Sequence, residues 1–534
     1  MPRARSSSAS AAFGGGLALG LSLALGISGP ALAAEISYAE RTKLLGSQVG
    51  NQDWFGHDVD VGGDTVIVGV WYQAPYGAAY IYERDADGIW VETIRLEAPD
   101  GGPDHEGFGR SVAISGDWIL VGANEDDDVA QHAGAAYLGH RNAGGGGTWG
   151  VVQKLLPSDG ALRTNFGDSV ALSGNTAAIG AEDGDSDSGA VYVFERDVEG
   201  SGDWQEIAKL KAPDSPRNGH FFGSSVDIDG DRLVAGAWGD DDLGGSAGAA
   251  YVFERDLGGP NNWGLARKLL ASDGAQGDYF GGLVTIDGET VATGAEDHDT
   301  GGELSRGAAY VFERDFGGPG NWGEIAKLTA IDGSRSDQFG SAVALDGDRL
   351  AIGARLDGDR GLNSGSVYVF ERNEGGPGAW GKIAKLIASD GRTEARFGHP
   401  LAFAGGRLAI SAPHDDDIGF QTGAVYVFDE IEIDPTLAVT GTCPGDATFD
   451  FRDGTPLGQA ALAFSRNEGS GEIPGGLCAG TETGLEVVNL LGILPIDAAG
   501  EVTLDATLPF FVCDLKLQVV DLVSCATSNV TTPP

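Results

Sequence analysis

The side chains with the clearest potential for chemistry are aspartates that recur in short loops along the chain. They are Asp126, Asp128, Asp183, Asp185, Asp187, Asp240, Asp242, Asp297, Asp299, Asp357, Asp359, Asp415 and Asp417. Carboxylates gathered at this density attract hard cations, and calcium takes about six to eight oxygen ligands. The loops are therefore expected to form weak calcium sites, with solvated turn residues that favour loop geometry as the alternative.

One loop comes closest to a calcium-binding pattern. Asp183, Asp185 and Asp187 alternate along the chain, as the first ligands of a calcium loop do. The loop lacks the glycine at the sixth place, and its twelfth place holds Phe194 instead of an acidic residue. Any calcium bound there is expected to be held weakly.

The common catalytic patterns are missing from the sequence. The eight histidines are scattered, and no His-Glu-x-x-His or phosphate-loop sequence is present. His57 and His399 each follow a Phe-Gly pair, which hints at a polar spot but at no reaction. We therefore expect no enzymatic activity. A polysaccharide lyase or hydrolase is the alternative, and it would need one repeat that breaks the pattern with clustered acid and base groups.

The acidic loops belong to a repeat that predicts the fold. Phe-Gly pairs recur every 53 to 59 residues, and each begins a unit of four short runs rich in β-branched and aromatic residues. The seven pairs are Phe55-Gly56, Phe108-Gly109, Phe166-Gly167, Phe222-Gly223, Phe280-Gly281, Phe339-Gly340 and Phe397-Gly398. Both faces of these runs are apolar, so each sheet needs cover on both sides. An all-β, seven-bladed β-propeller meets that need.

The two ends of the repeat region complement each other. The last unit stops after its third run, Gly423 to Phe428, and a lone fourth-run sequence lies at the other end, from Arg41 to Leu45. Tyr38 falls where other units carry tryptophan. An N-terminal strand is therefore expected to complete blade seven and remove the free edges. The alternatives are an open solenoid, which needs polar capping repeats, and separate sheets, which would expose too much apolar surface.

In such a ring, the acidic loop after the second strand and the Phe-Gly loop open on the same face. The acidic loops are therefore expected to surround one end of the central channel. The Phe-Gly pairs themselves are interpreted as structural, with the phenylalanine between blades and the glycine allowing a tight backbone.

The order of these elements resembles the FG-GAP repeat of integrin alpha subunits and of many bacterial secreted proteins. The Gly-Ala steps that follow the second run are Gly122-Ala123, Gly180-Ala181, Gly236-Ala237, Gly294-Ala295 and Gly353-Ala354. The resemblance covers about residues 38–430 and implies a seven-bladed propeller used for adhesion or ligand binding, often with calcium. Integrin-like units place their calcium loop between strands one and two. This chain has a tight turn there, such as Gly347-Asp348, so those metal sites do not transfer.

The N-terminus resembles a secretory signal. Residues 1–33 combine Arg3 and Arg5 with an apolar run and the small-x-small sequence Ala31-Leu32-Ala33. A membrane anchor is the alternative, but the apolar run is shorter than the roughly 20 residues that a span needs. The mature chain is therefore expected to be secreted or held at the cell surface, without a membrane span.

The formal charge of −45 is spread over the whole chain of 534 residues. Phosphate backbones would be repelled, which excludes nucleic acid as a partner. The expected partner is an extracellular protein or glycan, the expected state is a monomer, and a purely structural extracellular scaffold is the alternative.

The repeat ends before the C-terminal segment. We assign residues 34–430 to the propeller and 434–534 to a small β-sandwich, because the latter holds short β-prone runs and few helix signals. All four cysteines lie there: Cys443, Cys478, Cys513 and Cys525. An even count in an exported segment predicts two disulfides, and three pairings are possible.

Overall fold

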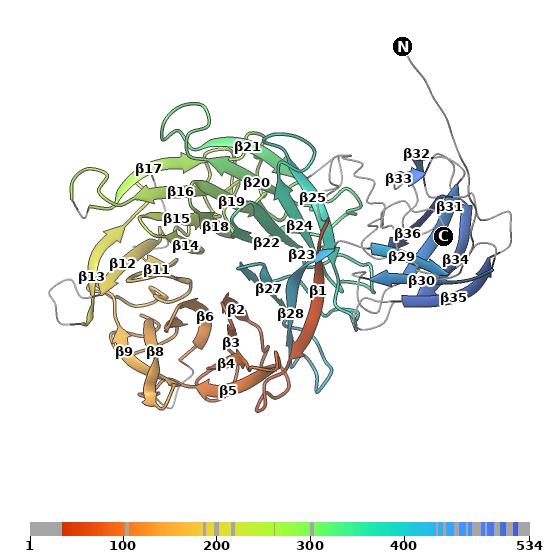
Figure 1. Cartoon of the computed structure of the whole chain (residues 1–534). Coiled ribbons are helices and arrows are strands. Elements are labelled where there is room, and N and C mark those ends of the chain that lie inside the picture. The colour runs from red at the N-terminus through yellow and green to blue at the C-terminus, as the bar shows by residue number, and fades with distance from the viewer. Residues whose placement is uncertain are drawn as a thin grey trace, which may run out of the picture.

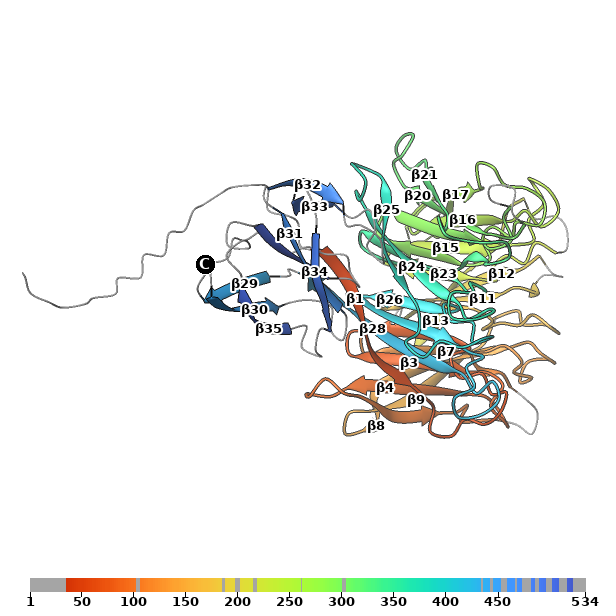
Figure 2. The same cartoon turned by 90° about the vertical axis from the view of Figure 1, so that its right-hand side faces the viewer.

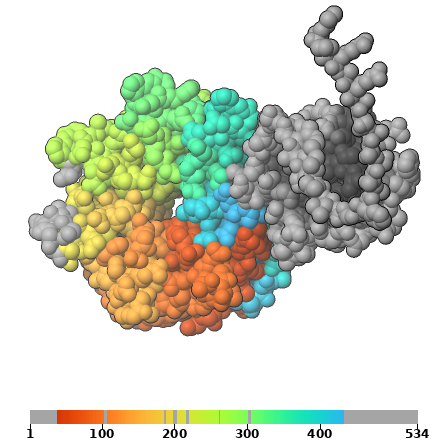
Figure 3. All heavy atoms as spheres, in the orientation of Figure 1, coloured from red at the N-terminus to blue at the C-terminus, as the bar shows by residue number. Residues whose placement is uncertain are grey.

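The computed structural model describes residues 35–101, 106–184, 188–196, 202–214, 219–260, 262–299 and 304–433, together with the C-terminal strands given below. All regular elements of these residues are β-strands, and 28 of them form seven four-stranded antiparallel sheets. The sheets follow one another around a ring (Figure 1), which Figure 3 shows with a narrow opening at its centre. The predicted seven-bladed propeller is confirmed.

The first three blades each contain four consecutive strands. They are β2 (Asp58–Gly62), β3 (Thr65–Val70), β4 (Ala78–Arg84) and β5 (Trp90–Leu96); β6 (Phe108–Ser115), β7 (Trp118–Ala123), β8 (Ala135–Gly145) and β9 (Thr148–Leu155); and β10 (Val170–Ser173), β11 (Thr176–Ala181), β12 (Ala190–Arg196) and β13 (Trp204–Leu210).

Blades four to six repeat this order. They are β14 (Val226–Asp229), β15 (Arg232–Ala237), β16 (Ala249–Glu254) and β17 (Gly264–Leu269); β18 (Val284–Asp287), β19 (Thr290–Ala295), β20 (Ala308–Glu313) and β21 (Gly323–Leu328); and β22 (Phe339–Asp346), β23 (Arg349–Ala354), β24 (Ser366–Arg372) and β25 (Trp380–Leu386). The first strand of each blade is innermost, and it contacts the first strand of the next blade.

Blade seven closes the ring with both ends of the repeat region. Its strands are β26 (Leu401–Ala404), β27 (Arg407–Ala412), β28 (Ala424–Ile433) and β1 (Glu35–Leu44). The N-terminal strand pairs antiparallel with β28, with Lys43 opposite Tyr426 and Leu44 opposite Val425. The predicted closure is confirmed, and the pairing runs further than expected, to Glu35 opposite Ile433.

The Phe-Gly pair joins one blade to the next, which explains its place in the repeat. Phe166 of blade three forms a bridge with Gly134 of blade two. A Cβ on Gly122, in the Gly-Ala step of blade two, would lie 2.0 Å from the carbonyl oxygen of Gly167. Backbones that approach this closely leave no room for a side chain, and Gly167 also has a positive φ of 93°. The same contact recurs between successive blades.

Side chains of the innermost strands satisfy the strand edges that face the channel. The last residue of one strand accepts a hydrogen bond from the backbone of the next blade: Ser115 Oγ from Gly174 N–H at 3.0 Å, and Asp229 Oδ2 from Gly288 N–H at 2.8 Å. These bonds pair N–H groups that no neighbouring strand covers.

One further contact packs each blade internally, and another joins neighbouring blades. Each Phe-Gly phenylalanine is fully buried and meets the tyrosine of its own third strand edge-on, as Phe222 does with Tyr251 at 5.4 Å between ring centroids. The third strand of several blades ends in a Glu-Arg dipeptide, and these residues form ion pairs between blades. Arg255 contacts Glu195 of the preceding blade at 3.0 Å, and Arg314 contacts Glu254 at 2.8 Å.

The C-terminal strands are separate from the propeller sheets. They form the sheets β29 (Thr436–Gly441), β30 (Gly445–Arg452) and β35 (Val502–Leu508); β34 (Asn489–Pro495), β31 (Gln459–Ser465) and β36 (Lys516–Asp521); and the pair β32 (Glu468–Glu472) and β33 (Glu482–Leu485). Figure 2, which turns the view by 90°, shows them apart from the seven blades. The four cysteines of the predicted disulfides, and residues 1–33 of the predicted signal peptide, lie outside the described residues.

Candidate functional site

Two positions in each blade lie where the inner strands meet the Phe-Gly face. The first follows the Phe-Gly pair: His57, Arg110, Asp168, Ser224, Gly282, Ser341 and His399. The second follows strand two: Trp71, Asn124, Glu182, Trp238, Glu296, Arg355 and Pro413. We call these fourteen residues the channel mouth. Ten of them line one of two cavities.

In blades one to three the mouth carries a charged network, which borders a cavity of about 390 Å³. Arg110 Nε donates to Asp168 Oδ1 at 2.8 Å, and Arg110 Nη1 lies 2.7 Å from His57 Nε2. The guanidinium also lies over the indole of Trp71, 4.6 Å from its ring centroid. Asn124 Nδ2 donates to Asp168 at 3.0 Å. These contacts hold the side chains of three blades in one arrangement.

Burial shifts the acidity of this network. The pKa of Glu182 is raised to about 8, first by burial and then by the charges of Asp168 and Asp183. Burial and the charge of Arg110 lower the pKa of His57 well below its usual value, so this imidazole is neutral at pH 7. A carboxyl group that titrates near neutral pH in a cavity is typical of a functional site.

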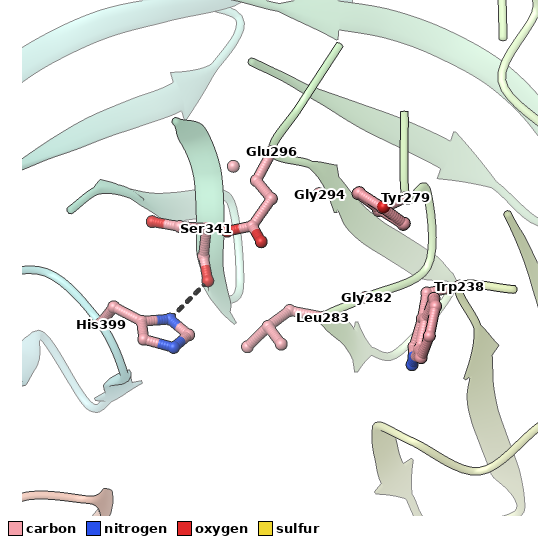
Figure 4. A pocket seen from close by; sticks show the side chains of 9 residues that line it. Trp238, Tyr279, Gly282, Leu283, Gly294, Glu296, Ser341 and His399 are labelled. Carbon is pink, nitrogen blue, oxygen red and sulfur yellow. Dashed lines mark hydrogen bonds between the residues drawn. The ribbon is translucent and has the colours of Figure 1, made fainter. Parts of the chain in front are cut away.

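In blades four to six the mouth is hollow. Here the residues that follow the Phe-Gly pairs are small: Ser224, Gly282 and Ser341. A cavity of about 360 Å³ extends from Trp238 of blade four to His399 of blade seven, with Glu296 on its wall (Figure 4). His57 and His399, which the sequence hinted at, both lie at the mouth.

The predicted acidic loops face a different way. Asp126 of blade two is fully buried and accepts hydrogen bonds from Tyr137 of the third strand at 2.9 Å and from Lys154 of the fourth at 2.7 Å. Lys154 Nζ also contacts Asp128 at 2.6 Å and Asp100 at 2.9 Å. In blade two the loop carboxylates therefore turn towards the outer strands and away from the channel, which corrects the expectation there. Asp183 of blade three instead lines the mouth cavity beside Arg110.

This cluster of one lysine, one tyrosine and three aspartates recurs in four blades. Its members are Lys154, Tyr137, Asp100, Asp126 and Asp128; Lys268, Tyr251, Asp214, Asp240 and Asp242; Lys385, Tyr368, Asp332, Asp357 and Asp359; and Lys43, Tyr426, Asp390, Asp415 and Asp417. Burial opposes the charge of each lysine, but the carboxylates raise its pKa above the usual value. Each ammonium is therefore permanently charged.

The other blades vary the cluster. In blade five His298 replaces the first aspartate. Its Nδ1 donates to Asp278 at 2.7 Å, and its Nε2 accepts from Lys327 Nζ at 2.7 Å. Asp297 accepts from Gln338 Nε2 at 2.9 Å, and Asp299 accepts from Ser305 N–H at 3.0 Å. In blade three Asp183 accepts from Asn165 Nδ2 at 2.6 Å. Asp185 and Asp187 lie outside the described residues.

These positions bear directly on calcium. In four blades a lysine ammonium lies among the three carboxylates, where a bound cation would lie. Among the residues with described positions, no group of three or more His, Cys, Asp or Glu side chains is arranged to hold a metal ion. Calcium binding by the acidic loops stays a prediction, and in four blades a calcium ion would compete with the lysine ammonium for the same carboxylates.

The channel interior carries a second set of carboxylates. Asp58 and Asp60 of β2 and Asp227 of β14 each accept two backbone N–H bonds, one from the next residue and one from the adjacent blade. Burial raises the pKa of Asp58 and Asp227 to about 6 and that of Asp60 to about 7. The sequence-based expectations included only His57 and His399 of the channel mouth and none of these three carboxylates.

A signal for the mouth was present in the sequence. The residues immediately after Phe-Gly and after Gly-Ala differ between successive blades, while the pairs that precede them largely repeat. Repeats that share a scaffold and diverge at one place mark that place as the binding surface.

The chain was compared with known families and proteins. The model of the FG-GAP repeat matches seven times, at residues 38–82, 90–139, 149–194, 204–253, 263–312, 322–370 and 380–428, which together exceed half of the chain. No curated protein matches the chain. FG-GAP repeats are typical of extracellular proteins, and no helix within the described ranges is both long and apolar enough to cross a membrane. By these seven matches and its closed ring of seven blades, the chain belongs to the FG-GAP repeat family.

Proposed function

We propose that this protein is exported and binds an extracellular protein or glycan, in adhesion or ligand capture, through the face that carries the Phe-Gly loops. The predicted signal peptide and the family's typical location support export. The charge of −45 disfavours nucleic acids and anionic membranes as partners.

The observation that carries the proposal is the asymmetry of the channel mouth. Scaffold contacts repeat in successive blades, but the mouth holds arginine, histidine, tryptophan, aspartate and glutamate in an order that never repeats. A structural scaffold would need no such variety. The buried carboxylate of Asp168 and the half-buried guanidinium of Arg110 cost desolvation energy, and such groups concentrate at functional sites.

Exposed apolar side chains on the same face support a macromolecular partner. The loops between strands two and three each present such a residue in five blades. These residues are Val129, Leu243, Leu304, Leu362, Ile418 and Phe420. Surface apolar groups of this kind supply the contact area of protein and glycan recognition.

The experiment compares the two faces of the ring. A double variant of the Phe-Gly face, Leu243→Glu with Leu304→Glu, changes side chains that are 41% and 49% exposed. Its matched control, Leu257→Glu with Phe316→Glu, changes side chains on the opposite face that are 41% and 54% exposed and adds the same charge. Both are applied, with the wild type, to arrays of immobilised peptides and oligosaccharides.

The Phe-Gly-face variant should lose about tenfold or more in affinity while the control binds as the wild type does. Equal binding by all three proteins, or loss only in the control, would contradict the proposal. The structural-scaffold alternative predicts no binding on either array.

A carbohydrate-cleaving enzyme is a second candidate, and one observation favours it. The raised pKa of Glu182, about 8, would keep its carboxyl protonated at neutral pH, as a general acid requires. New reducing ends released from array-positive oligosaccharides, and lost in Glu182→Gln, would favour the enzyme over the binding protein.

A further inference from the structure

The cavity in the hollow half of the mouth has the size and lining of a small-ligand site. Its volume is about 360 Å³, within the roughly 300–1,000 Å³ range of such sites. Aromatic and aliphatic side chains line it beside a few polar groups, as Figure 4 shows for Trp238, Leu283, Glu296 and His399. Its walls come from blades four to seven, so it belongs to the closed ring and to no single blade.

Small residues create this space. The position after the Phe-Gly pair holds Gly282 and Ser341 here, where the opposite blades hold Arg110 and Asp168. A Cβ built on Gly282 would lie 3.2 Å from the carbonyl oxygen of Tyr279 and meets nothing else within 4 Å. The cavity therefore differs from the one on the opposite side of the mouth, which charged side chains such as Arg110 and Asp168 line.

Trp238 forms one wall and is fixed in place. Phe221 stacks on it in parallel, with ring centroids 4.2 Å apart and an interplanar angle of 8°. Tyr279 meets it edge-on at 5.7 Å, and its indole N–H donates to the carboxyl group of Glu182. Figure 4 shows the indole close to edge-on at the side of the cavity, so that a ring face is turned towards the space. Such a held aromatic face is a platform for stacking, and binding need not order it first.

The polar groups of the cavity are balanced in charge. Glu296 pairs with Arg355, with 3.1 Å between Oε2 and Nη2. His399 Nδ1 lies 2.6 Å from the carbonyl oxygen of Ser341 and therefore donates to it, which leaves Nε2 as an acceptor. The cavity thus offers acceptors on Glu296 and His399, and Arg355 offsets the charge of Glu296. Acceptors without an uncompensated charge suit the donor hydroxyl groups of a neutral ligand better than a free cation or anion.

We propose that this cavity binds one end of a neutral oligosaccharide, with the apolar face of a sugar ring stacked on Trp238 and its hydroxyls bonded to Glu296 and His399. The inference rests on the proposed function and names its ligand class. A neutral glycan is specified because the charge of −45 repels acidic chains. Surrounding exposed side chains such as Leu304 would contact what carries the glycan.

The experiment uses the whole chain without residues 1–33, on an array of neutral and acidic oligosaccharides and a parallel array of peptides. The strongest array oligosaccharide is then titrated calorimetrically as a free compound. Two variants change the cavity in different ways: Trp238→Ala removes the stacking platform, and Gly282→Leu fills the space. Trp118→Ala is the matched control, because Trp118 begins a second strand on the opposite face of the ring, beneath Arg196. Thermal unfolding of each variant verifies folding.

The wild type and Trp118→Ala should bind neutral oligosaccharides, and both cavity variants should raise Kd about 30-fold or more, as loss of a hot-spot aromatic does. Binding that survives both cavity variants would overturn the inference, as would a preference for acidic glycans. Peptide binding that needs Trp238, without oligosaccharide binding, would overturn the saccharide and leave the proposed function standing. No binding on either array would overturn both.

Discussion

The two halves of the channel mouth share one backbone scaffold but carry different side chains. In blades one to three, Arg110, His57, Trp71 and Asp168 form a bonded, charged network beside a polar cavity of about 390 Å³. In blades four to six, Gly282 and Ser341 leave a cavity beside Trp238. Backbone contacts between the blades are the same on both sides, because the Phe-Gly seam recurs at each. The difference teaches that the scaffold sets where the mouth lies, and that two variable positions per blade decide what it holds.

The comparison requires a closed ring, so the largest effect should follow from opening it. Deletion of residues 35–48 removes β1, exposes the edge of β28 and takes Lys43 from the blade-seven cluster. We expect a fall in the melting temperature of more than about 10 °C, or loss of cooperative unfolding. Calorimetry of the truncated and full chains measures this. An unchanged melting curve would contradict closure by the N-terminal strand.

If the scaffold is equal on both sides, its disruption should cost the same in either half. Lys154→Met in blade two and Lys268→Met in blade four each leave a fully buried aspartate, Asp126 or Asp240, without its cation. We expect each to lower the free energy of unfolding by about 3–5 kcal/mol in urea titrations. Lys327→Met is the milder control at about 1 kcal/mol, because its partner Asp273 is 51% exposed.

The same variants test calcium. In Lys268→Met the carboxylates of Asp214, Asp240 and Asp242 stay together without the ammonium. Calorimetric heat on adding calcium to this variant, and none with the wild type, would show that the lysine takes the place of a cation. Heat with the wild type that is lost after Asp185→Asn with Asp187→Asn would instead support the predicted calcium loop of blade three.

Substitutions at the mouth should separate the two halves. Arg110→Met leaves the buried Asp168 short of its main partner, and we expect a loss of about 3 kcal/mol in stability. Trp238→Ala enlarges a cavity that already exists, and we expect a loss of about 1–2 kcal/mol. Urea unfolding of both variants gives the difference. Equal losses would mean that the side of the mouth around Trp238 is as important for stability as the charged network around Arg110.

The smallest effect should come from pH, through channel carboxylates that both halves supply. Because the folded-state pKa values of Asp58, Asp60 and Asp227 lie above the ordinary value, the folded state holds protons that the unfolded state has lost. Their contribution to stability is complete below about pH 4 and is lost as the pH rises through 6 to 7. We expect a decrease of about 1 kcal/mol or more between pH 4.5 and 7.5.

The substitution Asp60→Asn should flatten this slope, since the amide does not titrate. Below about pH 4 stability should fall for a different reason. Although burial opposes it, the lysines hold the pKa of Asp100, Asp214 and Asp332 below the ordinary value, and that contribution is lost on protonation. A stability that rises steadily with pH from 4 to 8 would contradict the assignment of the channel carboxylates.

The fold could be read from the sequence because its causes are local and repeated. Glycine in Phe-Gly and Gly-Ala is dictated by backbone contacts between blades, so the same residues return every 53 to 59 positions. Closure of the ring could be predicted in the same way, because blade seven lacks a fourth strand and a matching strand sequence lies near Arg41. A strand and turn pattern that is weak in one unit becomes clear when seven units share it.

The site needed the tertiary structure. An aspartate such as Asp240 looks the same in sequence whether it faces a metal or a lysine, and only the return of strand four brings Lys268 to it. Glu182, Trp238 and Glu296 lie more than 50 residues apart from one another and meet only because the blades converge on a channel. Sequence determined the ring, since each blade's contacts are encoded within neighbouring units. Tertiary structure alone decided which of its charges are satisfied and where the mouth is hollow, because those depend on side chains from blades distant in the chain.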